Sequence, residues 1–376
     1  MLVTYLAHDL DDPSIWRRVE MLTRGGAQVR VAGFRRGDGP LPQPAIILGR
    51  TANGRMVQRL AAVAAALPRI ARLVPPPNGP EVVLARNLEM LMLGAALQRR
   101  RPLRLVYELL DIHAMVVGSG AKSLAIRKVE AALMRRASLV VVSSPAFLTR
   151  YRDDFGQPRI PSLLVENKPF ADAMPRSPAP AARSGGPLVI GWFGMLRCRF
   201  SLEALDRLTR AEPGRFKAIL RGKPALDVLP GFHDVIAANP DMEFHGPYSW
   251  PGDLPQIYGE VDLAWLIDRY QAGQNSDWLL PNRLYEGCLN GAVPVVLNGT
   301  EVARRVQTWN CGPVLPSTDD GAIRATLSGL GPQDLARFRH ALAVIPKDRL
   351  HMDRAECGTL TRAICGTAAF PAEEAA

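Results

Sequence analysis

The sequence predicts an α/β protein made of two doubly wound, Rossmann-like domains that face each other across a cleft. The first observation is that short, β-branched apolar runs alternate with helical patterns along almost all of the 376 residues. A parallel sheet that is covered on both faces requires such runs. The second is a single break in the alternation at 172–187 (DAMPRSPAPAARSGGP), whose Pro, Ser and Gly content indicates an exposed linker.

Strands and helices of the first half follow one another as a doubly wound sheet requires. The predicted strands are the apolar runs 2–6, 29–33, 82–85, 103–107 and 139–143. The predicted helices carry apolar residues at helical spacing over 16–24, 57–73, 88–99 and 123–136. We therefore predict an N-terminal domain over residues 1–171.

The alternation resumes after the linker and predicts a second domain over 188–353. Its predicted strands are 188–193, 216–220, 261–267 and 293–297. Its predicted helices are 202–210, 284–290 and 332–343. A C-terminal helix and tail follow at 354–376. Because ligands of open parallel sheets bind beyond the carboxyl ends of the strands, the residues at these ends are the candidate site.

The charge of the chain predicts anionic partners. It holds 46 Lys and Arg against 36 Asp and Glu, a net charge of +10, and only six of the basic residues are Lys. Anionic lipid and phosphorylated ligands fit this charge. Nucleic acid is not expected, because no basic run exceeds three residues and none is interleaved with aromatic side chains.

Cysteine usage and hydropathy predict a cytoplasmic protein. The five cysteines are far apart and form no CxxC pair, which favours neither disulfides nor a zinc site. The longest weakly polar stretch, 60–67, is far shorter than the ~20 residues that span a bilayer. We expect a soluble chain or one that is peripheral on a membrane.

The most informative segment is 275–297, in which a short helix precedes a buried strand. Pro281 and Asn282 are good helix starters, with Asn282 as the cap, and Gly291 ends the helix. The helix start suits phosphate, and a bound anion would offset the unfavourable cation Arg283 in the first turn. Glu286 could accept hydrogen bonds from a ribose diol. The alternative is an ordinary helix with a surface Arg–Glu pair.

The string LPNRLYEGCLNGAVPVV at 280–296 resembles the nucleotide-sugar motif of family-four-like glycosyltransferases with the GT-B fold. Their usual pattern is Pro-Asn-Lys-Leu-Phe-Glu, followed by a small residue and Gly-x-Pro-Val-Val. The segments HDLDDPSIWRRVEMLTRGGAQVRVAGFRR and WLLPNRLYEG also resemble bacterial exopolysaccharide glycosyltransferases of the succinoglycan type. The resemblance makes Glu286 the ribose-binding residue and puts Arg283 in place of the Lys. The donor-site candidates of this segment are Asp277, Asn282, Arg283, Leu284 and Glu286.

One departure from that family bears on the stereochemistry. Retaining members carry two glutamates separated by seven residues, and counting back from Glu286 reaches Trp278 instead of the first one. Asp277 is adjacent but out of register. Retention is therefore in doubt, and an inverting displacement with a carboxylate or His as general base is slightly favoured.

Three further strand ends in the second half supply donor-site candidates. In the resembled family the loop after the strand at 188–193 approaches the donor diphosphate. Gly194 allows close backbone approach there, and a nearby Arg can pair with phosphate. The alternative is a plain turn with surface arginines. His245 lies in a loop that resembles the one near the nucleotide base, although a structural role is favoured. The diphosphate candidates are Gly194, Arg197, Arg221, Gly222 and Lys223.

The general-base candidates lie at strand ends of the first half. Asp111 and His113 are two residues apart and point the same way in an extended chain. The resembled family often has a His-Asp-type sequence there, facing the acceptor. Asp9 ends the first strand at an equivalent place. The alternative for both carboxylates is helix capping.

A basic amphipathic segment could lie on an anionic membrane surface. Residues 55–72 carry the apolar stripe Met56, Leu60, Val63, Leu67 and Ile70. The basic residues that bracket this stripe are Arg55, Arg59, Arg69 and Arg72. The alternative is a packed domain helix with exposed arginines.

Together these features predict a glycosyltransferase that moves a sugar from a nucleoside diphosphate donor, UDP-linked by expectation, to a glycan acceptor. The resemblance implies that this acceptor is a lipid-linked oligosaccharide of exopolysaccharide assembly. The second domain would bind the donor, and the first would bind the acceptor. Arginines and a helix N-terminus could stabilise the leaving diphosphate, so no cofactor and metal independence are expected. The alternatives are an epimerase or phosphorylase of the same fold, or a non-catalytic nucleotide-sugar or lipid-binding subunit.

Overall fold

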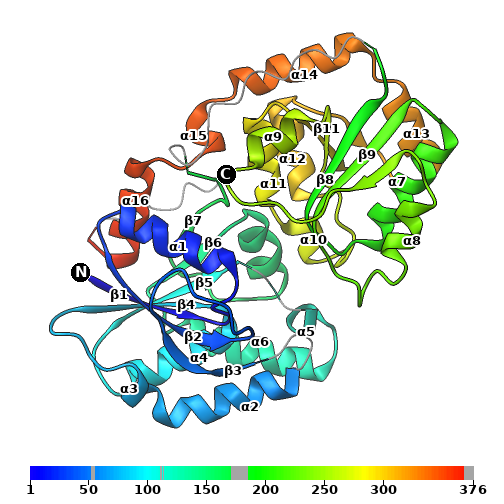
Figure 1. The fold of residues 1–376 in the computed structure, drawn as a ribbon. Helices are drawn as coiled ribbons and strands as arrows, with labels where there is room; N and C mark the ends of the chain where they lie inside the picture. The colour runs from blue at the N-terminus through cyan, green and yellow to red at the C-terminus, as the bar shows by residue number, and fades with distance from the viewer. Residues whose placement is uncertain (52–55, 111, 113, 171–184, 368–376) are drawn as a thin grey trace. The chain divides into compact units, whose positions relative to one another are not determined.

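The computed structural model describes residues 1–51, 56–110, 112, 114–170 and 185–367 (Figure 1). The chain forms two compact units, the first made of Met1–Glu166 with Arg354–Ala376 and the second of Asn167–Asp353. Each unit contains a parallel sheet with helices packed against it, which confirms the predicted fold class. The predicted linker falls mostly on 171–184, outside the described residues.

The sheet of the N-terminal unit has seven parallel strands in the order β3-β2-β1-β4-β5-β6-β7. The chain adds β2 and β3 on one side of β1 and then places β4 on the other side, so the strand order reverses between β1 and β4. The strands are β1 (Leu2–Ala7), β2 (Gln28–Arg35), β3 (Ile46–Arg50), β4 (Glu81–Arg86), β5 (Arg104–Leu109), β6 (Leu139–Val142) and β7 (Ser162–Leu164).

The first helix of this unit begins where the local sequence favours it. The side chain of Asp12 accepts a hydrogen bond from the N–H of Ser14 at 2.9 Å, and Pro13 stands in the first turn. The helices are α1 (Pro13–Arg24), α2 (Met56–Ala66), α3 (Ile70–Leu73), α4 (Asn87–Gln98), α5 (Ala114–Val117) and α6 (Ala121–Met134), with a 3-10 turn η1 (Leu67–Arg69) and a π-helix η2 (Phe147–Asp153).

The C-terminal helix α16 (Arg354–Cys365) packs against α1 in the N-terminal unit. A Cβ atom on Gly25 would lie 2.0 Å from Oγ1 of Thr361, so the two helices approach closely where α1 ends. Arg104 of β5 donates to the carbonyl oxygen of Ile364 at 2.9 Å. The helix that we predicted as a separate tail is therefore part of the first unit.

The sheet of the C-terminal unit has six parallel strands in the order β10-β9-β8-β11-β12-β13. Its strand order reverses between β8 and β11, in the same way as the first sheet reverses between β1 and β4. The strands are β8 (Leu188–Leu196), β9 (Phe216–Pro224), β10 (Met242–Phe244), β11 (Leu263–Trp265), β12 (Val293–Leu297) and β13 (Val314–Leu315).

Large aromatic side chains fill the core of this unit, among them Trp192, Phe216 and Trp265, each at most 1% exposed. Burial of side chains of this size contributes strongly to stability. The helices are α7 (Arg199–Ala211), α8 (Phe232–Ala237), α9 (Leu254–Gly259), α10 (Asn275–Trp278), α11 (Asn282–Leu289), α12 (Glu301–Trp309), α13 (Asp320–Ser328), α14 (Pro332–Val344) and α15 (Lys347–Leu350).

Two of the predicted helices differ from the structure in more than a small shift of their ends. The helix expected over 57–73 is interrupted by η1, where Pro68 has no N–H to continue the helical ladder. Helix α11 begins at Asn282 itself, and Pro281 occupies the cap position without a side-chain hydrogen bond. The prediction that Asn282 caps this helix is therefore wrong. Gly291 has a φ of +77°, as expected for a glycine that ends a helix.

Candidate functional site

The start of α11 lies beside the carboxyl end of β8. Nη1 of Arg283, in the first turn of α11, donates to the carbonyl oxygen of Phe193 at 3.4 Å. Nε of Arg283 is buried and has no hydrogen-bond partner among the described residues. A cation at a helix N-terminus is unfavourable by itself, so this guanidinium and the first-turn N–H groups suit a bound anion.

One turn further along α11, Glu286 places a carboxylate inside the unit. The residue is 3% exposed, and its Oε1 accepts a hydrogen bond from Nε1 of Trp250 at 2.9 Å. Burial and the charge of Glu286 raise the pKa of Tyr258 well above its usual value, so this phenol stays neutral beside the carboxylate. A buried carboxylate of this kind differs from the surface Arg–Glu pair of the alternative reading.

Two side chains meet where the second sheet reverses its strand order. Nη2 of Arg197, after β8, lies 3.7 Å from Oδ2 of Asp268, after β11. The guanidinium also lies 4.8 Å from the centre of the Tyr270 ring. Gly194 has a φ of +105°, and a Cβ there would meet only the Tyr248 hydroxyl, at 4.0 Å. The backbone at Gly194 is therefore open to close approach, and its role at the donor diphosphate stays a prediction.

The predicted phosphate contacts at the end of β9 stay a prediction, and two of these residues also have structural contacts. Nη2 of Arg221 forms a 2.7 Å ion pair with Oε2 of Glu260. Gly222 has a φ of +128°, and a Cβ on it would lie 1.9 Å from the carbonyl oxygen of Gly194, so strand packing requires this glycine. Lys223 is exposed on the strand. Arg221 and Gly222 thus have structural roles that sequence alone did not reveal.

The remaining candidates of the second unit differ in their surroundings. Nε2 of His245 lies 2.8 Å from Oε2 of Glu243, which favours the structural role. Oδ2 of Asp277 accepts from the N–H of Gly273 at 2.7 Å, while its Oδ1 is buried without a partner among the described residues. Leu284 is fully buried and supports α11 from the core. Asn282 is partly exposed at the helix start.

Of the general-base candidates, the structure describes Asp9, whereas Asp111 and His113 lie outside the described residues. Asp9 is 7% exposed and its Oδ2 lies 3.2 Å from Nε of Arg36. Burial raises the pKa of the Asp9 carboxyl. The capping alternative for Asp9 is wrong, because Asp12 caps α1.

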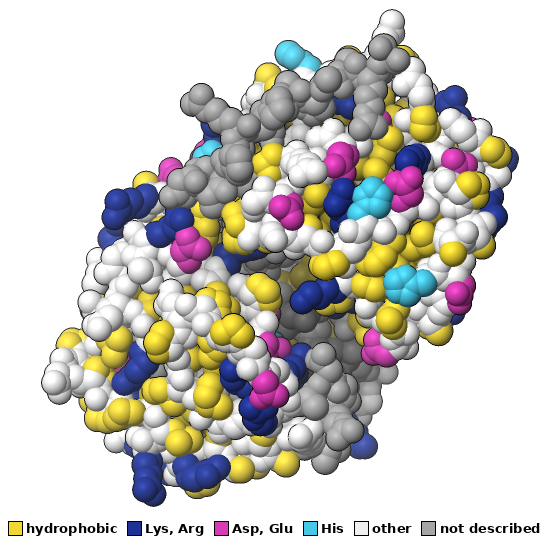
Figure 2. All heavy atoms as spheres, in the orientation of Figure 1, with side chains coloured by type: hydrophobic (Ala, Val, Ile, Leu, Met, Phe, Trp, Pro, Cys, Tyr) yellow, Lys and Arg dark blue, Asp and Glu magenta, His cyan; other side chains and the backbone are white. Residues whose placement is uncertain are grey.

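The basic amphipathic segment is divided between the core and the surface. Val63 and Ile70 are buried, while Leu60 is 49% exposed, so the predicted apolar stripe does not form one face. Arg69 and Arg72 are exposed. In Figure 2, Lys and Arg side chains lie beside hydrophobic ones at the lower edge of the view, over the helices of this segment.

Of the other two arginines predicted to bracket that segment, the structure describes only Arg59. Nη2 of Arg59 pairs with Oε1 of Glu89 at 2.8 Å, and its side chain is 19% exposed, so it faces α4. Arg55 lies outside the described residues.

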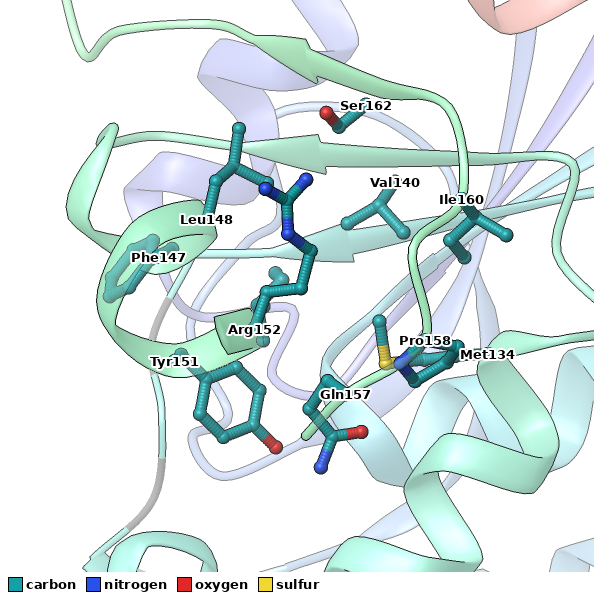
Figure 3. Close-up of a pocket in the computed structure, with 11 residues that line it drawn as sticks. Met134, Val140, Phe147, Leu148, Tyr151, Arg152, Gln157, Pro158, Ile160 and Ser162 are labelled. Carbon is teal, nitrogen blue, oxygen red and sulfur yellow. The ribbon is translucent and has the colours of Figure 1, made fainter. Parts of the chain in front are cut away.

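A small pocket of the N-terminal unit lies between η2, β6 and residues 157–162 (Figure 3). Its lining is largely apolar, and its polar members include Arg152, Gln157 and Ser162. The enclosed volume of about 10 Å³ accommodates a single water molecule. This pocket is therefore too small for a sugar.

The described part of the chain contains no group of three or more His, Cys, Asp or Glu side chains that could hold a metal ion. Metal independence stays a prediction. None of the helices among the described residues is both long and apolar enough to cross a bilayer.

Solved structures share this architecture over nearly the whole chain. HepE from Anabaena in complex with UDP-glucose has a TM-score of 0.72 at 18% identity, covering 98% of this chain and 99% of that one. Sucrose-phosphate synthase from Thermosynechococcus elongatus has a TM-score of 0.71 at 13% identity, over 98% and 100%. WaaG, a glycosyltransferase involved in lipopolysaccharide biosynthesis, has a TM-score of 0.67 at 14% identity, over 97% and 100%. The protein has the GT-B fold of glycosyltransferases.

Sequence similarity to a known protein identifies the family within the GT-B glycosyltransferases. The chain is 40% identical to the succinoglycan biosynthesis protein ExoL of Rhizobium meliloti (strain 1021), over 96% of this chain and 92% of ExoL. No protein-family model matches the chain. The protein therefore belongs to the family of ExoL, GT-B glycosyltransferases of exopolysaccharide biosynthesis, which confirms the resemblance in its sequence.

Proposed function

We propose that this protein transfers a sugar from a UDP-sugar to a lipid-linked oligosaccharide in exopolysaccharide assembly. The unit Asn167–Asp353 binds the donor, and the N-terminal unit binds the acceptor. The observation that carries the proposal is the buried carboxylate of Glu286 one turn from Arg283, in a helix that begins beside the end of β8. The structures of HepE with UDP and with UDP-glucose support the choice of donor.

The donor contacts follow from the chemistry of the described side chains. Glu286 accepts hydrogen bonds from the ribose hydroxyls, and Trp250 orients its carboxylate. Arg283 and Arg197 pair with the diphosphate, whose negative charge grows as the sugar leaves. Gly194 lets the backbone approach the phosphates. These cations stabilise the negative charge of the leaving diphosphate, as a metal ion does in metal-dependent enzymes. The reaction is therefore metal-independent in this proposal.

The proposed transfer is an inverting displacement. A general base removes the proton from an acceptor hydroxyl, whose oxygen attacks the anomeric carbon as the bond to the diphosphate breaks and UDP leaves. Asp111, with His113, and Asp9 are the candidates for this base. Trp278 occupies the position of the first glutamate in retaining relatives and offers no carboxylate for a retaining route.

The acceptor in this proposal is membrane-anchored, so the protein docks on the cytoplasmic face of the membrane. The exposed residues Leu60, Arg69 and Arg72 of this segment support this, because arginines attract anionic headgroups and an apolar side chain can insert shallowly.

A donor screen tests the proposal. UDP-, GDP- and dTDP-glucose are added to the purified protein, and the unfolding temperature is measured. A ligand at 100 times its Kd adds ~2.7 kcal/mol of stability. UDP-glucose should stabilise the wild type and not Glu286→Ala. Glu203→Ala on α7, an exposed site 49% accessible at the side chain, is the matched control and should behave as wild type. No stabilisation of the wild type by any of the three would contradict the proposal.

The same Trp278 favours one second candidate, a non-catalytic subunit that binds a nucleotide sugar or lipid without transferring the sugar. Such a subunit binds UDP-glucose yet releases no UDP from it. Release of UDP by the wild type, in the presence of a lipid-linked acceptor extract, excludes this candidate. An epimerase or phosphorylase would instead act with a free sugar or phosphate as the acceptor.

A further inference from the structure

The first sheet reverses its strand order between β1 and β4, where ligands of open parallel sheets bind. These two strands are neighbours in Figure 1 and pair in parallel, with Leu6 beside Ala85. Two residues further, each chain leaves its strand, at His8 after β1 and at Asn87 after β4. The register therefore brings these two side chains to the same point of the sheet edge.

Asn87 adopts a backbone conformation that side chains rarely adopt. Its φ is +69°, although it is the first residue of α4 and not a glycine. Its Oδ1 is buried and has no hydrogen-bond partner among the described residues. An unmatched buried acceptor costs stability, and residues in sparsely populated backbone conformations cluster at functional sites.

His8 has the same kind of unmatched polar atom. Its Nδ1 is buried without a partner in the described part of the chain, while the residue as a whole is partly exposed. Burial, and then the charge of Arg86, lower the pKa of His8 to about 3; the other charged groups that face it are Asp12, Arg59 and Arg36. The imidazole is therefore neutral at pH 7 and can both donate and accept a hydrogen bond.

The arginines around His8 are already balanced by carboxylates. The ion pairs are Arg36 with Asp9 at 3.2 Å, Arg59 with Glu89 at 2.8 Å, and Arg86 with Asp12 at 3.5 Å. A phosphate would compete with these carboxylates for the same guanidinium groups. A neutral ligand rich in hydroxyl groups fits the site better, because it needs only donors and acceptors.

We propose that His8 and Asn87 bind hydroxyl groups of the acceptor glycan at this reversal of the strand order, an inference that rests on the proposed function. Both side chains are partly exposed. Binding requires rotation about χ2, which is broad and two-fold for His and Asn, to bring Nδ1 and Oδ1 out of their buried positions. The pair selects and orients the glycan that receives the sugar.

Lactose and cellobiose, two neutral disaccharides, are the probes, and NMR titration gives their affinity together with the shift of the His8 ring nitrogens. Asn87→Gly keeps the backbone conformation without strain and removes only the amide. His8→Leu removes the ring nitrogens, whereas His8→Asn returns a polar atom near the position of Nδ1. His340→Leu, at an exposed site on α14, is the control.

We expect a wild-type complex with at least one disaccharide, a shift of the His8 resonances, and a loss of about fivefold or more in affinity for Asn87→Gly and His8→Leu. His8→Asn should recover part of the disaccharide affinity that His8→Leu loses. The Asn87→Gly protein should melt at the wild-type temperature or above, so the loss would not reflect unfolding.

Absence of disaccharide binding by the wild type, or unchanged affinity in both variants, overturns the inference. So does a loss of affinity for UDP-glucose, because the hydroxyls bound would then belong to the donor sugar. Binding of UDP by the wild type is measured in parallel. If UDP binds and the disaccharides do not, the inference fails while the proposed donor site stands.

Discussion

Trp250 donates its indole N–H to the carboxylate of Glu286, with 2.9 Å between Nε1 and Oε1. Trp250 lies in the loop after β10, and Glu286 lies in the middle of α11. A carboxylate that is 3% exposed needs hydrogen bonds to remain charged, and this donor also fixes its orientation. The loop after β10 therefore helps to set the geometry of the proposed ribose site.

Replacement of Trp250 by Phe should weaken UDP binding about tenfold. The variant keeps an aromatic ring but removes the N–H, and hydrogen bonds to charged groups contribute ~1.5–3 kcal/mol. Isothermal titration with UDP gives the affinity. Trp309→Phe on α12 is the matched control and should retain the wild-type value. Equal affinities for Trp250→Phe and wild type would remove this role of Trp250.

Replacement of Arg283 by Ala should lower the affinity for UDP and leave that for uridine unchanged. Each charge-assisted hydrogen bond to the diphosphate is worth ~1.5–3 kcal/mol, so a loss of about 10- to 100-fold is expected. Competition binding with both ligands measures the difference. Arg324→Ala on α13, which is exposed, serves as the control. A parallel loss for uridine would mean that Arg283 acts through the fold rather than on phosphate.

The long elements of the fold were predictable because their apolar patterns are continuous. Strand β12 (Val293–Leu297) has the predicted bounds, and helix α1 starts only three residues before its predicted first residue. The short strands β3, β7, β10 and β13 were missed because each offers only a few apolar residues between polar, Pro or Gly residues. Their pairing depends on neighbours that are distant in sequence, which local patterns do not encode.

The site was predictable only in part. The motif around α11 located Arg283 and Glu286, because a helix start and a buried strand are local signals. Sequence did not reveal that Glu260 holds Arg221 or that Trp250 holds Glu286, since each pair joins residues 36 or more positions apart. A single tryptophan in a loop carries no local signal for a hydrogen bond to a distant carboxylate.

Asp111→Asn should lower turnover by ~10²–10⁴-fold with donor affinity unchanged, because the change keeps the shape but removes the proton acceptor. The measurement is UDP release in the presence of acceptor. Asp9→Asn is assayed beside it, since the buried Asp9 carboxyl has a raised pKa. If Asp111→Asn stays within a few-fold of wild type while Asp9→Asn or His113→Ala is inactive, the role of base moves to that residue.

The state of His8 should make stability depend on pH. The folded protein keeps this imidazole neutral down to about pH 3, whereas the unfolded chain protonates it near pH 6.5. Between these values the unfolded state binds more protons, so stability falls as pH falls from 6.5. Urea unfolding at pH 6.5, 5.5 and 4.5 gives the free energy of unfolding at each pH. In His8→Leu, this free energy should change with pH less than in the wild type, by up to ~1.4 kcal/mol per pH unit. The slope of His340→Leu should match the wild type, and equal slopes in all three proteins would contradict a neutral His8.

The last prediction concerns membrane docking. Arg69 and Arg72 are exposed, whereas Arg59 pairs with Glu89, so we expect the first two arginines to meet headgroups. Each basic residue near an anionic surface is worth ~1 kcal/mol, and salt screens it. The purified protein should sediment with anionic vesicles, not with neutral ones, and should be released as salt rises.

The double variant Arg69→Gln/Arg72→Gln should bind anionic vesicles ~30-fold more weakly and keep its turnover on a soluble acceptor. The control is Arg207→Gln/Arg210→Gln on α7, two arginines with 45% and 46% exposed side chains in the other unit. Because the control removes the same net charge, it separates a local docking surface from a general effect of charge. Equal weakening by both pairs would assign binding to net charge. Sedimentation with neutral and anionic vesicles alike, or with neither, would leave residues 56–73 as ordinary helices of the N-terminal unit.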